Sequence, residues 1–359
     1  MSWWRETGGD NRGMPSTVSA APAPRPHRAA ASAADSADAA QSNELCGTPS
    51  AGGAARAGLA RRLRKLRRVF DLEALRHEPL AAPQVIDYYN HCHDAYRKHH
   101  SAEGAVHMAL NDGDRFDADG FYGQLRRIER LWATPPDDVL ELAFGQGFNL
   151  AYLAPRHPRC RWSGIDLTPA HLLIAAERLR REDLDRVALR PGDFHALPYS
   201  DASFDHIFCI EAFCYASDLP KAFAEVARVL RPGGSFVLFD GYLPRPPHEL
   251  LADEAMAVEL VAKGMAIEGL QELAKLLGTA QSAALKTMSC TALDAEVMPS
   301  LRRLEHTTGA VIRLPGLGRR ALARRSAARG RNVIAGHLMA TTVAMGLIGY
   351  REIVLRKES

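Results

Sequence analysis

The sequence predicts an α/β fold, a doubly wound sheet of seven mainly parallel strands with helical insertions near the C-terminus. Two observations predict this class. From residue 139 onward, short apolar runs typical of buried strands alternate with amphipathic helical segments. Acidic residues also follow the first four runs, at Glu141, Asp166, Asp193 and Glu211. In parallel sheets, ligands bind beyond the carboxyl ends of the strands, so these acids are expected at a ligand site.

The first expected strand, 139–142, ends in a loop of small residues, Ala143 to Gly147. Glycines let a backbone approach a ligand closely, so the loop is expected to cradle a nucleotide-like cofactor. A dinucleotide fingerprint requires a third glycine, but Leu150 stands at that position. The Lys-Ser/Thr pair of a nucleoside triphosphate loop is also absent. The pattern therefore disfavours cofactors that are held by their phosphates.

The remaining elements follow in alternation. Thr168 and Pro169 predict a helix start, with Thr168 as the N-cap and Pro169 at the first helical position. A second helix is expected to start at Asp218. Helix is expected over 249–277, and mostly helix over 293–347. Further strands are expected at 161–166, 187–190, 203–211, 235–240, 286–292 and 350–356.

Five motifs carry a family resemblance. They are Glu-Leu-Ala-Phe-Gly-Gln-Gly at 141–147, Gly-Ile-Asp at 164–166, Gly-Asp-Phe-His-Ala-Leu-Pro-Tyr at 192–199, Phe-Asp-His-Ile-Phe-Cys-Ile-Glu-Ala at 204–212, and Val-Leu-Arg-Pro-Gly-Gly at 229–234. In this order they resemble class I S-adenosylmethionine-dependent methyltransferases. The closest resemblance is to the small-molecule group that includes ubiquinone/menaquinone, sterol and tocopherol methyltransferases. It covers residues 85–242 and implies a Rossmann-like sheet with its last strand antiparallel.

The resemblance implies S-adenosylmethionine as the cofactor and a role for each matching residue. Glu141 would lie near the amino end of the methionine part, and Glu211 under the sulfonium. The backbones of Ala143, Gly145 and Gly147 would wrap the cofactor, and a helix around Tyr89 would cover it. Asp166 would bind the ribose hydroxyls and Leu167 the adenine; Asp193 would accept from the adenine amine, with Phe194 beside it. Ala143 departs from the family, which usually has glycine there.

The chemistry of this cofactor agrees with the acids. S-adenosylmethionine carries a cationic sulfonium and a ribose diol but no phosphate, so carboxylates and backbone groups suit it better than lysine or arginine. Methyl transfer needs mainly an in-line alignment of the acceptor, and a base only for a protonated acceptor. The candidate catalytic residues are His107, Glu211 and Tyr215. For His107 a purely structural role competes with catalysis, and Tyr215 fits a pocket wall as well as a base.

Composition narrows the class of partner. A net charge of +3 is nearly neutral and does not favour nucleic acid. No apolar run reaches the roughly 18 residues of a membrane span. Six scattered cysteines indicate no disulfide framework, and the histidines at 91–100 face different sides of an expected helix, so no metal is expected. We expect a small, apolar acceptor and a cytoplasmic location; the sequence does not indicate an oligomeric state.

Two stretches, 61–68 and 319–331, are rich in basic residues. They are consistent with peripheral contact with anionic lipid, and the simpler interpretation is that they are solvated helix faces.

The sequence predicts four parts of the chain. Residues 1–58, rich in Ala, Pro, Ser and Gly, form a disordered leader, and 59–130 an N-terminal helical cap. Residues 131–242 form the cofactor-binding core, and 243–359 contain the helical acceptor-pocket region and the last strands.

Three functions stay open at this point. The first is S-adenosylmethionine-dependent methylation, at C or O, of a lipid-, quinone-, sterol- or secondary-metabolite-like acceptor. The second is a non-catalytic binding protein of the same fold, which the substitution at Ala143 keeps under consideration. The third, an NAD-dependent oxidoreductase, is disfavoured by the missing third glycine.

Overall fold

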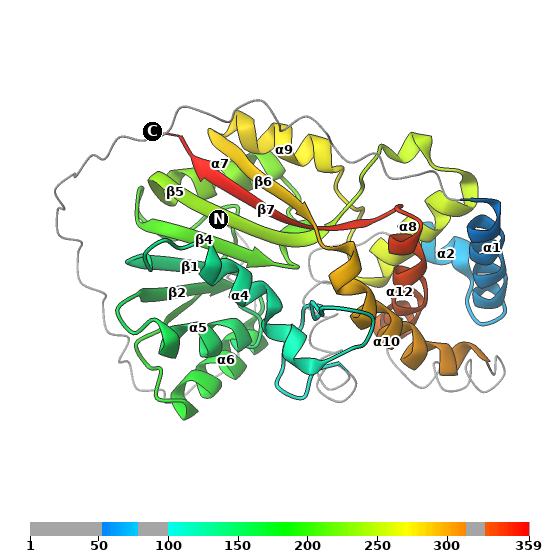
Figure 1. The fold of residues 1–359 in the computed structure, drawn as a ribbon, viewed down its shortest axis with the longest axis horizontal. Helices are drawn as coiled ribbons and strands as arrows, with labels where there is room; N and C mark the ends of the chain where they lie inside the picture. Colours follow the sequence, from blue (N-terminus) through cyan, green and yellow to red (C-terminus); the bar gives the residue numbers. More distant parts are fainter. Residues whose placement is uncertain (1–51, 78–99, 314–326, 359) are drawn as a thin grey trace, which may run out of the picture. The chain divides into compact units, whose positions relative to one another are not determined.

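The computed structural model describes residues 52–77, 100–313 and 327–358. Its strands form one seven-stranded sheet in the order β3-β2-β1-β4-β5-β7-β6, in which β7 runs antiparallel to both of its neighbours (Figure 1). The predicted fold class is therefore confirmed. The strands are β1 Asp138–Leu142, β2 Arg161–Asp166, β3 Ala188–Pro191, β4 Phe204–Ile210, β5 Leu230–Tyr242, β6 Leu285–Ala292 and β7 Gly349–Lys357.

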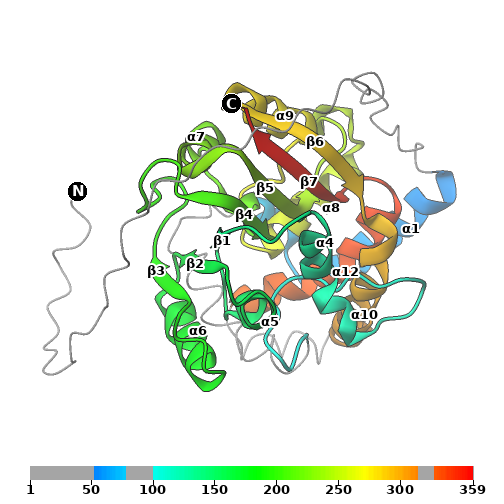
Figure 2. The same cartoon turned by 60° about the vertical axis from the view of Figure 1, so that its left-hand side comes forward.

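Helices cover both faces of this sheet. Helices α4, α5 and α6 pack on the face that carries Val139 and Phe208, while α7 and α9 pack on the face that carries Leu140 and Ile207 (Figures 1 and 2). Side chains along a strand alternate between the two faces, so each strand contributes to two cores. The bounds are α4 Gly123–Arg130, α5 Phe148–Arg156, α6 Pro169–Arg181, α7 Leu219–Val229 and α9 Leu273–Ser282.

A separate group of helices lies beyond the carboxyl ends of β4 and β5 (Figure 1). Helix α8 contacts α1, α2 and α12, and α12 also contacts α1 and α10. The buried Leu59, Leu63 and Leu66 recur at helical spacing on α1, which explains why that helix packs here. The bounds are α1 Gly53–Arg67, α2 Leu72–His77, α8 Ala252–Gly264, α10 Asp294–Arg313 and α12 Ala327–Ala344. The described residues also form short 3₁₀ helices, η1 Ala118–Tyr122, η2 Phe213–Tyr215 and η3 Pro247–Glu249.

Two expected elements differ from the structure. The helical segment expected over 249–277 is interrupted, because α8 ends at Gly264 and α9 begins at Leu273. Ala266 takes a positive φ of 59°, which a right-handed helix does not allow. The fifth strand begins at Leu230 rather than at Ser235. Gly233, with φ of 77°, bends the chain there without ending the strand.

Some expectations fall outside the described residues. The helix expected to hold Tyr89 and the histidines at 91, 93 and 99 lies there, as does most of the expected leader. Helix α1 begins at Gly53, within the range assigned to that leader. Among the helices of the described ranges, none combines the length and apolar character that crossing a membrane requires.

The contact between α8 and α12 generates a prediction. A Cβ on Gly264 would lie 2.6 Å from Ala335 Cβ and 2.8 Å from the Arg331 carbonyl oxygen, whereas a Cβ on Gly278 in α9 meets nothing within 4 Å. We expect Gly264→Ala to lower the free energy of unfolding by about 1–3 kcal/mol through overpacking. Gly278→Ala should raise it by about 0.5–1 kcal/mol, because alanine favours helix. Urea denaturation measures both, and changes of the same sign would contradict this packing.

Candidate active site

A cavity of about 490 Å³ opens at the carboxyl ends of β1, β2, β3 and β4. This is the edge of a doubly wound sheet where ligands bind, and the volume suits a small-molecule site. The loop after α8, from Ala266 to Gln271, closes the opposite side. Of the predicted cofactor residues, Ala143, Gly145, Asp166, Leu167, Asp193 and Phe194 line the cavity. Glu211 and Tyr215 line it as well.

Asp166 organises the end of β2. Its Oδ2 accepts from the Gly145 amide at 2.8 Å and its Oδ1 from the Thr168 amide at 2.8 Å. The His171 Nδ1 lies 3.2 Å from Oδ1. Thr168 is the N-cap of α6, as expected, but its side chain makes no capping hydrogen bond; the His171 amide donates to the Thr168 carbonyl oxygen instead, at 3.0 Å. A carboxylate has about four lone-pair positions, so Asp166 keeps capacity for a hydroxyl group.

The loop between β1 and α5 has left-handed backbone at three positions. Gly145 and Gly147 have φ of 55° and 73°, and Ala143 has φ of 58°. This conformation is unfavourable for alanine because its Cβ crowds the following carbonyl oxygen. Gly147 lies away from the cavity lining. A Cβ there would approach Ala175 Cβ at 3.0 Å, so this glycine lets α5 and α6 pack closely.

Asp193 and Phe194 lie at the end of β3. The Asp193 Oδ1 accepts from the His195 amide at 2.9 Å and from the His195 ring Nδ1 at 2.6 Å. The other ring nitrogen of His195 accepts from the Asp218 amide at 3.3 Å, which fixes the ring between two loops. Leu167 is 52% exposed although it is apolar, and it faces this cavity. Such a side chain suits the face of a flat aromatic group.

Glu141 and His107 form a buried chain behind the cavity. The Glu141 Oε1 accepts from Asn149 Nδ2 at 2.6 Å, and the Asn149 Oδ1 lies 3.2 Å from His107 Nε2. The His107 Nδ1 lies 3.1 Å from the Met108 carbonyl oxygen. Burial raises the pKa of Glu141 to about 8 and lowers the pKa of His107. Neither side chain is among the described residues that line the cavity.

Glu211 connects β4 with two distant segments. Its Oε1 accepts from the Met108 amide at 2.7 Å and from the Tyr350 hydroxyl at 2.8 Å. Gln124 Nε2 donates to the Met108 carbonyl oxygen at 2.7 Å and to the Tyr350 hydroxyl oxygen at 3.2 Å. Burial raises the pKa of Glu211 to about 8, although these donors oppose the shift. No described residue forms a hydrogen bond with the second oxygen of Glu211, and the side chain faces the cavity.

Tyr215 and Asp240 complete the end of β4 and β5. The Tyr215 hydroxyl donates to the Met265 carbonyl oxygen at 2.7 Å, which ties the turn after β4 to the end of α8. The Asp240 carboxylate accepts from the Cys214 amide at 3.0 Å and from the Gly241 amide at 2.8 Å. Burial raises the pKa of Asp240 to about 6.

The charge of the lining is one-sided. Four acids, Asp166, Asp193, Glu211 and Glu268, line the cavity, and no lysine or arginine of the described ranges does. Of these, Glu268 is paired with Lys263 at 3.0 Å. An orphaned acceptor, the buried Oε2 of Glu141, also lies behind the loop after β1, without a described partner. Such a site suits a cationic ligand with hydroxyl and amine groups, and S-adenosylmethionine fits this description.

Sequence reasoning missed several residues that organise the site. Tyr350 donates to Glu211, and Gln124, 226 positions before Tyr350, donates to the Tyr350 hydroxyl oxygen. No local pattern predicts such contacts. Two other residues could have been predicted from the sequence. They are His171, five positions after Asp166, and Asn149, eight positions after Glu141. A polar residue on the inner face of the first helical turn after such an acid is the signal.

The backbone at Ala143 generates a prediction. Replacing an alanine in the left-handed conformation by glycine removes an unfavourable contribution of about 1–2 kcal/mol from the folded state. The greater conformational entropy of glycine in the unfolded chain offsets about 0.4–1 kcal/mol of this gain. We therefore expect Ala143→Gly to leave the free energy of unfolding unchanged or to raise it by about 1 kcal/mol. Ala176→Gly, on the exposed side of helix α6, is the matched control and should lower it by about 1 kcal/mol. Guanidinium denaturation compares them; equal losses would show that Ala143 is unstrained.

Glu211 generates a prediction on pH. Its pKa in the folded protein, about 8, lies above the ordinary 4.5, so ionisation of this group opposes folding. The stability that it contributes is complete below pH 4.5 and is lost as the pH rises through 8. We expect Glu211→Gln to stabilise the protein relative to wild type at pH 9 but not at pH 4.5, by at most about 5 kcal/mol.

Thermal and urea unfolding at both pH values measure this difference. Glu141, whose pKa is also raised, is present in both proteins, so the comparison isolates Glu211. A gap between the two proteins that does not change with pH would refute the raised pKa of Glu211.

Comparisons with known proteins agree with this geometry. The family described as Methyltransferase domain matches residues 139–234. Methyltransferase GfsG of Streptomyces halstedii is 38% identical over 113 residues, 31% of this chain and 40% of that protein. The 24-methylenesterol C-methyltransferase 2 of Oryza sativa subsp. japonica is 28% identical over 177 residues, 49% of this chain and 48% of that protein. The chain thus spans less than half the length of these relatives.

Solved methyltransferase structures share this fold, and one of them serves as an example. It is geranyl diphosphate C-methyltransferase from Streptomyces coelicolor A3(2), with a TM-score of 0.58 and 14% sequence identity, over 78% of this chain and 100% of that one. The matched residues 139–234 contain the loop after β1 and the ends of β2, β3 and β4, which surround the cavity. Residues 139–234 therefore match a methyltransferase domain, and the chain shares its fold with this methyltransferase structure.

Proposed function

We propose that this chain transfers a methyl group from S-adenosylmethionine to a carbon or oxygen atom of a small, apolar or amphiphilic acceptor. The observation that carries the proposal is the cavity at the carboxyl ends of β1–β4, lined by four carboxylates and by no described lysine or arginine. A sulfonium is cationic and carries no phosphate, so this lining matches it better than it matches dinucleotides or nucleoside triphosphates.

Individual residues support a pose for the cofactor. Asp166 holds the ribose hydroxyls, because its carboxylate faces the cavity and keeps free acceptor capacity. The exposed Leu167 and Phe194 lie against the adenine, with Asp193 at its amine. The backbones of Ala143 and Gly145 contact the methionine part. Glu141 and Gly147 act from behind this loop, since they do not line the cavity.

The acceptor side of the proposal rests on the apolar part of the wall. Val106, Ile210, Ala212 and Ile267 face the same cavity. Burying apolar surface of an acceptor against such side chains stabilises the complex by about 25 cal/mol per Å² of apolar surface. An acceptor with an apolar body and one reactive polar end fits this site, because the body would pack against the apolar wall while the polar end would reach Glu211. A lipid, quinone or sterol-like compound has this chemistry.

Glu211 is the best candidate for a proton acceptor. It faces the cavity, and its pKa of about 8 is near the working pH, where a general base is most effective. When bound, S-adenosylmethionine would supply an electrophilic methyl group to the acceptor, and Glu211 would take the proton of an O–H acceptor. Tyr215 is better explained as a wall that positions the acceptor, because its hydroxyl is engaged by Met265. His107 positions Asn149 and thereby Glu141.

We also propose a division of roles between the parts of the chain. Residues 131–242 would bind the cofactor, and the helices of 59–130 and 243–359 would shape the acceptor side. The proposal includes a cytoplasmic location and no nucleic-acid partner. The loop after α8 supports an acceptor role for the C-terminal part, since Ala266, Ile267 and Gly269 line the cavity.

Calorimetric titration with S-adenosylhomocysteine tests cofactor binding. We expect Asp166→Asn to weaken binding by about 10- to 100-fold, since hydrogen bonds to a charged group contribute about 1.5–3 kcal/mol. Asp185→Asn, an exposed acid outside the cavity, is the control and should bind like wild type. Leu167→Ser provides a second variant with little risk to folding, because that side chain is exposed. No binding to wild type would end the proposal.

Release of S-adenosylhomocysteine in the presence of quinones, sterols and phenolic lipids then tests catalysis. Glu211→Gln should lower kcat with an O–H acceptor while the affinity for S-adenosylhomocysteine changes little. Cofactor binding without product from any acceptor class would favour the non-catalytic alternative.

A further inference from the structure

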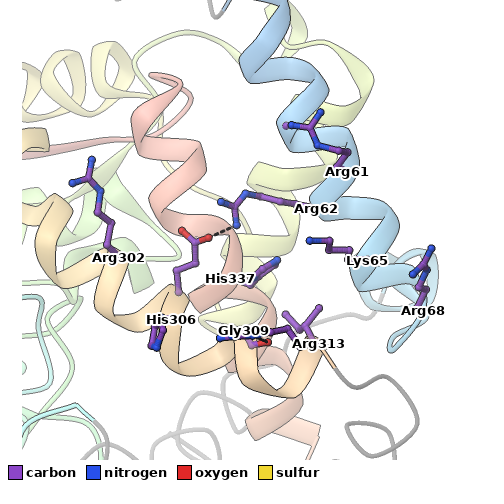
Figure 3. Close-up of a pocket in the computed structure, with 12 residues that line it drawn as sticks. Arg61, Arg62, Lys65, Arg68, Arg302, His306, Gly309, Arg313 and His337 are labelled. Carbon is purple, nitrogen blue, oxygen red and sulfur yellow. Dashed lines mark hydrogen bonds and ion pairs between the residues drawn. The ribbon is translucent and has the colours of Figure 1, made fainter.

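A second cavity, of about 680 Å³, lies among helices α1, α10 and α12 (Figure 3). It shares no lining residue with the candidate active site. Its cations are Arg61, Arg62 and Lys65 from α1, Arg68 directly after that helix, and Arg302 and Arg313 from α10. Glu305 is the only acid among the described lining residues. The two cavities are therefore opposite in charge.

The sequence of α1 accounts for one wall of this cavity. Leu59, Leu63 and Leu66 recur every three or four residues and are buried. The basic residues 61, 62, 65 and 68 occupy the positions between them and face away from that core. Packing of the leucines against the helical group thus turns the cations toward α10. In Figure 3, Arg62 and Lys65 extend from α1 toward α10.

Most of this positive charge is not neutralised within the described residues. Arg62 forms an ion pair with Glu305 across the cavity. Arg61, Lys65 and Arg68 form no ion pair with any described residue, and Arg302 lies 3.9 Å from Asp114, whose side chain is 99% exposed. Like charges on facing helices repel each other, so this arrangement costs stability unless an anion offsets it.

His337 provides an independent sign of a ligand. This side chain lines the cavity from α12 and is only 8% exposed. Both of its ring nitrogens are buried without a hydrogen-bond partner among the described residues. An unsatisfied buried polar group is costly, and native proteins rarely leave one without a reason. Figure 3 shows the ring between α1 and α10, at the centre of the basic residues.

We propose that this cavity is a binding site for a ligand that carries a multiply charged phosphate group. The facing cations of α1 and α10 would contact its oxygens, and His337 would donate one N–H from the floor. Phosphate oxygens accept several hydrogen bonds at once, and guanidinium groups match their geometry. A carboxylate offers only two oxygens and one charge. The proposal is independent of methyl transfer.

Titration with pyrophosphate at physiological ionic strength tests the site. We expect saturable binding and a thermal stabilisation that is larger for pyrophosphate than for inorganic phosphate, and absent for chloride at matched ionic strength. The paired variant Arg61→Ala/Lys65→Ala should weaken binding at least about 10-fold, since charged hydrogen bonds are lost. His337→Leu should weaken it too, while His337→Gln keeps an N–H donor and should retain more affinity.

The control is Arg64→Ala. Arg64 lies on the same helix with the same charge, but it does not line the cavity. Its replacement should change the affinity less than about 2-fold. Losses equal to those of the paired variant would mean that only net charge matters and would overturn the proposal. An absence of saturable binding to wild type would overturn it as well. Arg68→Ala replaces the paired variant if that protein does not fold.

Vesicles identify the source of the phosphate. Phosphatidylcholine vesicles with and without phosphatidic acid are sedimented with the protein, and pyrophosphate is added as a competitor. Binding that needs phosphatidic acid and that pyrophosphate displaces assigns the site to a lipid headgroup. Pyrophosphate binding without vesicle binding assigns it to a soluble phosphate compound. Either result supports the proposal, and vesicle binding that pyrophosphate does not displace counts against it.

Discussion

The hydrogen bond from the Gly145 amide to the Asp166 carboxylate is the contact on which the candidate site depends. It joins the loop after β1 to the end of β2, and the same carboxylate binds the Thr168 amide and approaches His171. One side chain therefore sets the relative position of two loops and of helix α6. It also holds the loop in a conformation that Ala143 adopts unfavourably. A short polar anchor can maintain such strain because it is buried and charged.

A second constraint comes from the segment that precedes the sheet. Met108 donates its amide to Glu211 and accepts from Gln124 through its carbonyl oxygen, while His107 lies beside it and approaches Asn149. Two glutamates with pKa values of about 8 are thereby held by one short stretch of chain. Their burial makes each easily protonated, and a cationic ligand would favour the charged form. Binding of a cationic cofactor and ionisation of these two glutamates would therefore favour each other.

The helical group beyond β4 and β5 is built differently from the sheet. Its helices come from both ends of the described chain and pack through leucine faces, as Leu59, Leu63 and Leu66 of α1 illustrate. One buried acid, Glu254, receives Arg56 at 3.1 Å and so links α1 to α8. The acidic cavity lies between the sheet and the loop after α8, and the basic cavity lies among α1, α10 and α12. The two sites can therefore differ completely in charge without interfering.

The sequence by itself determined the fold class, the order of strands and helices in the core, and the acids at the strand ends. Those features depend on local patterns: apolar runs, glycine loops, and acids spaced by one strand and one helix. Only the tertiary structure decided which candidates face the cavity. It turned Asp166, Glu211 and Tyr215 inward and placed Glu141 and His107 behind them. It also joined Tyr350 to Glu211 and Gln124 to Tyr350, and it set α1 against α10. Contacts between distant segments are decided by packing, which no short-range pattern encodes.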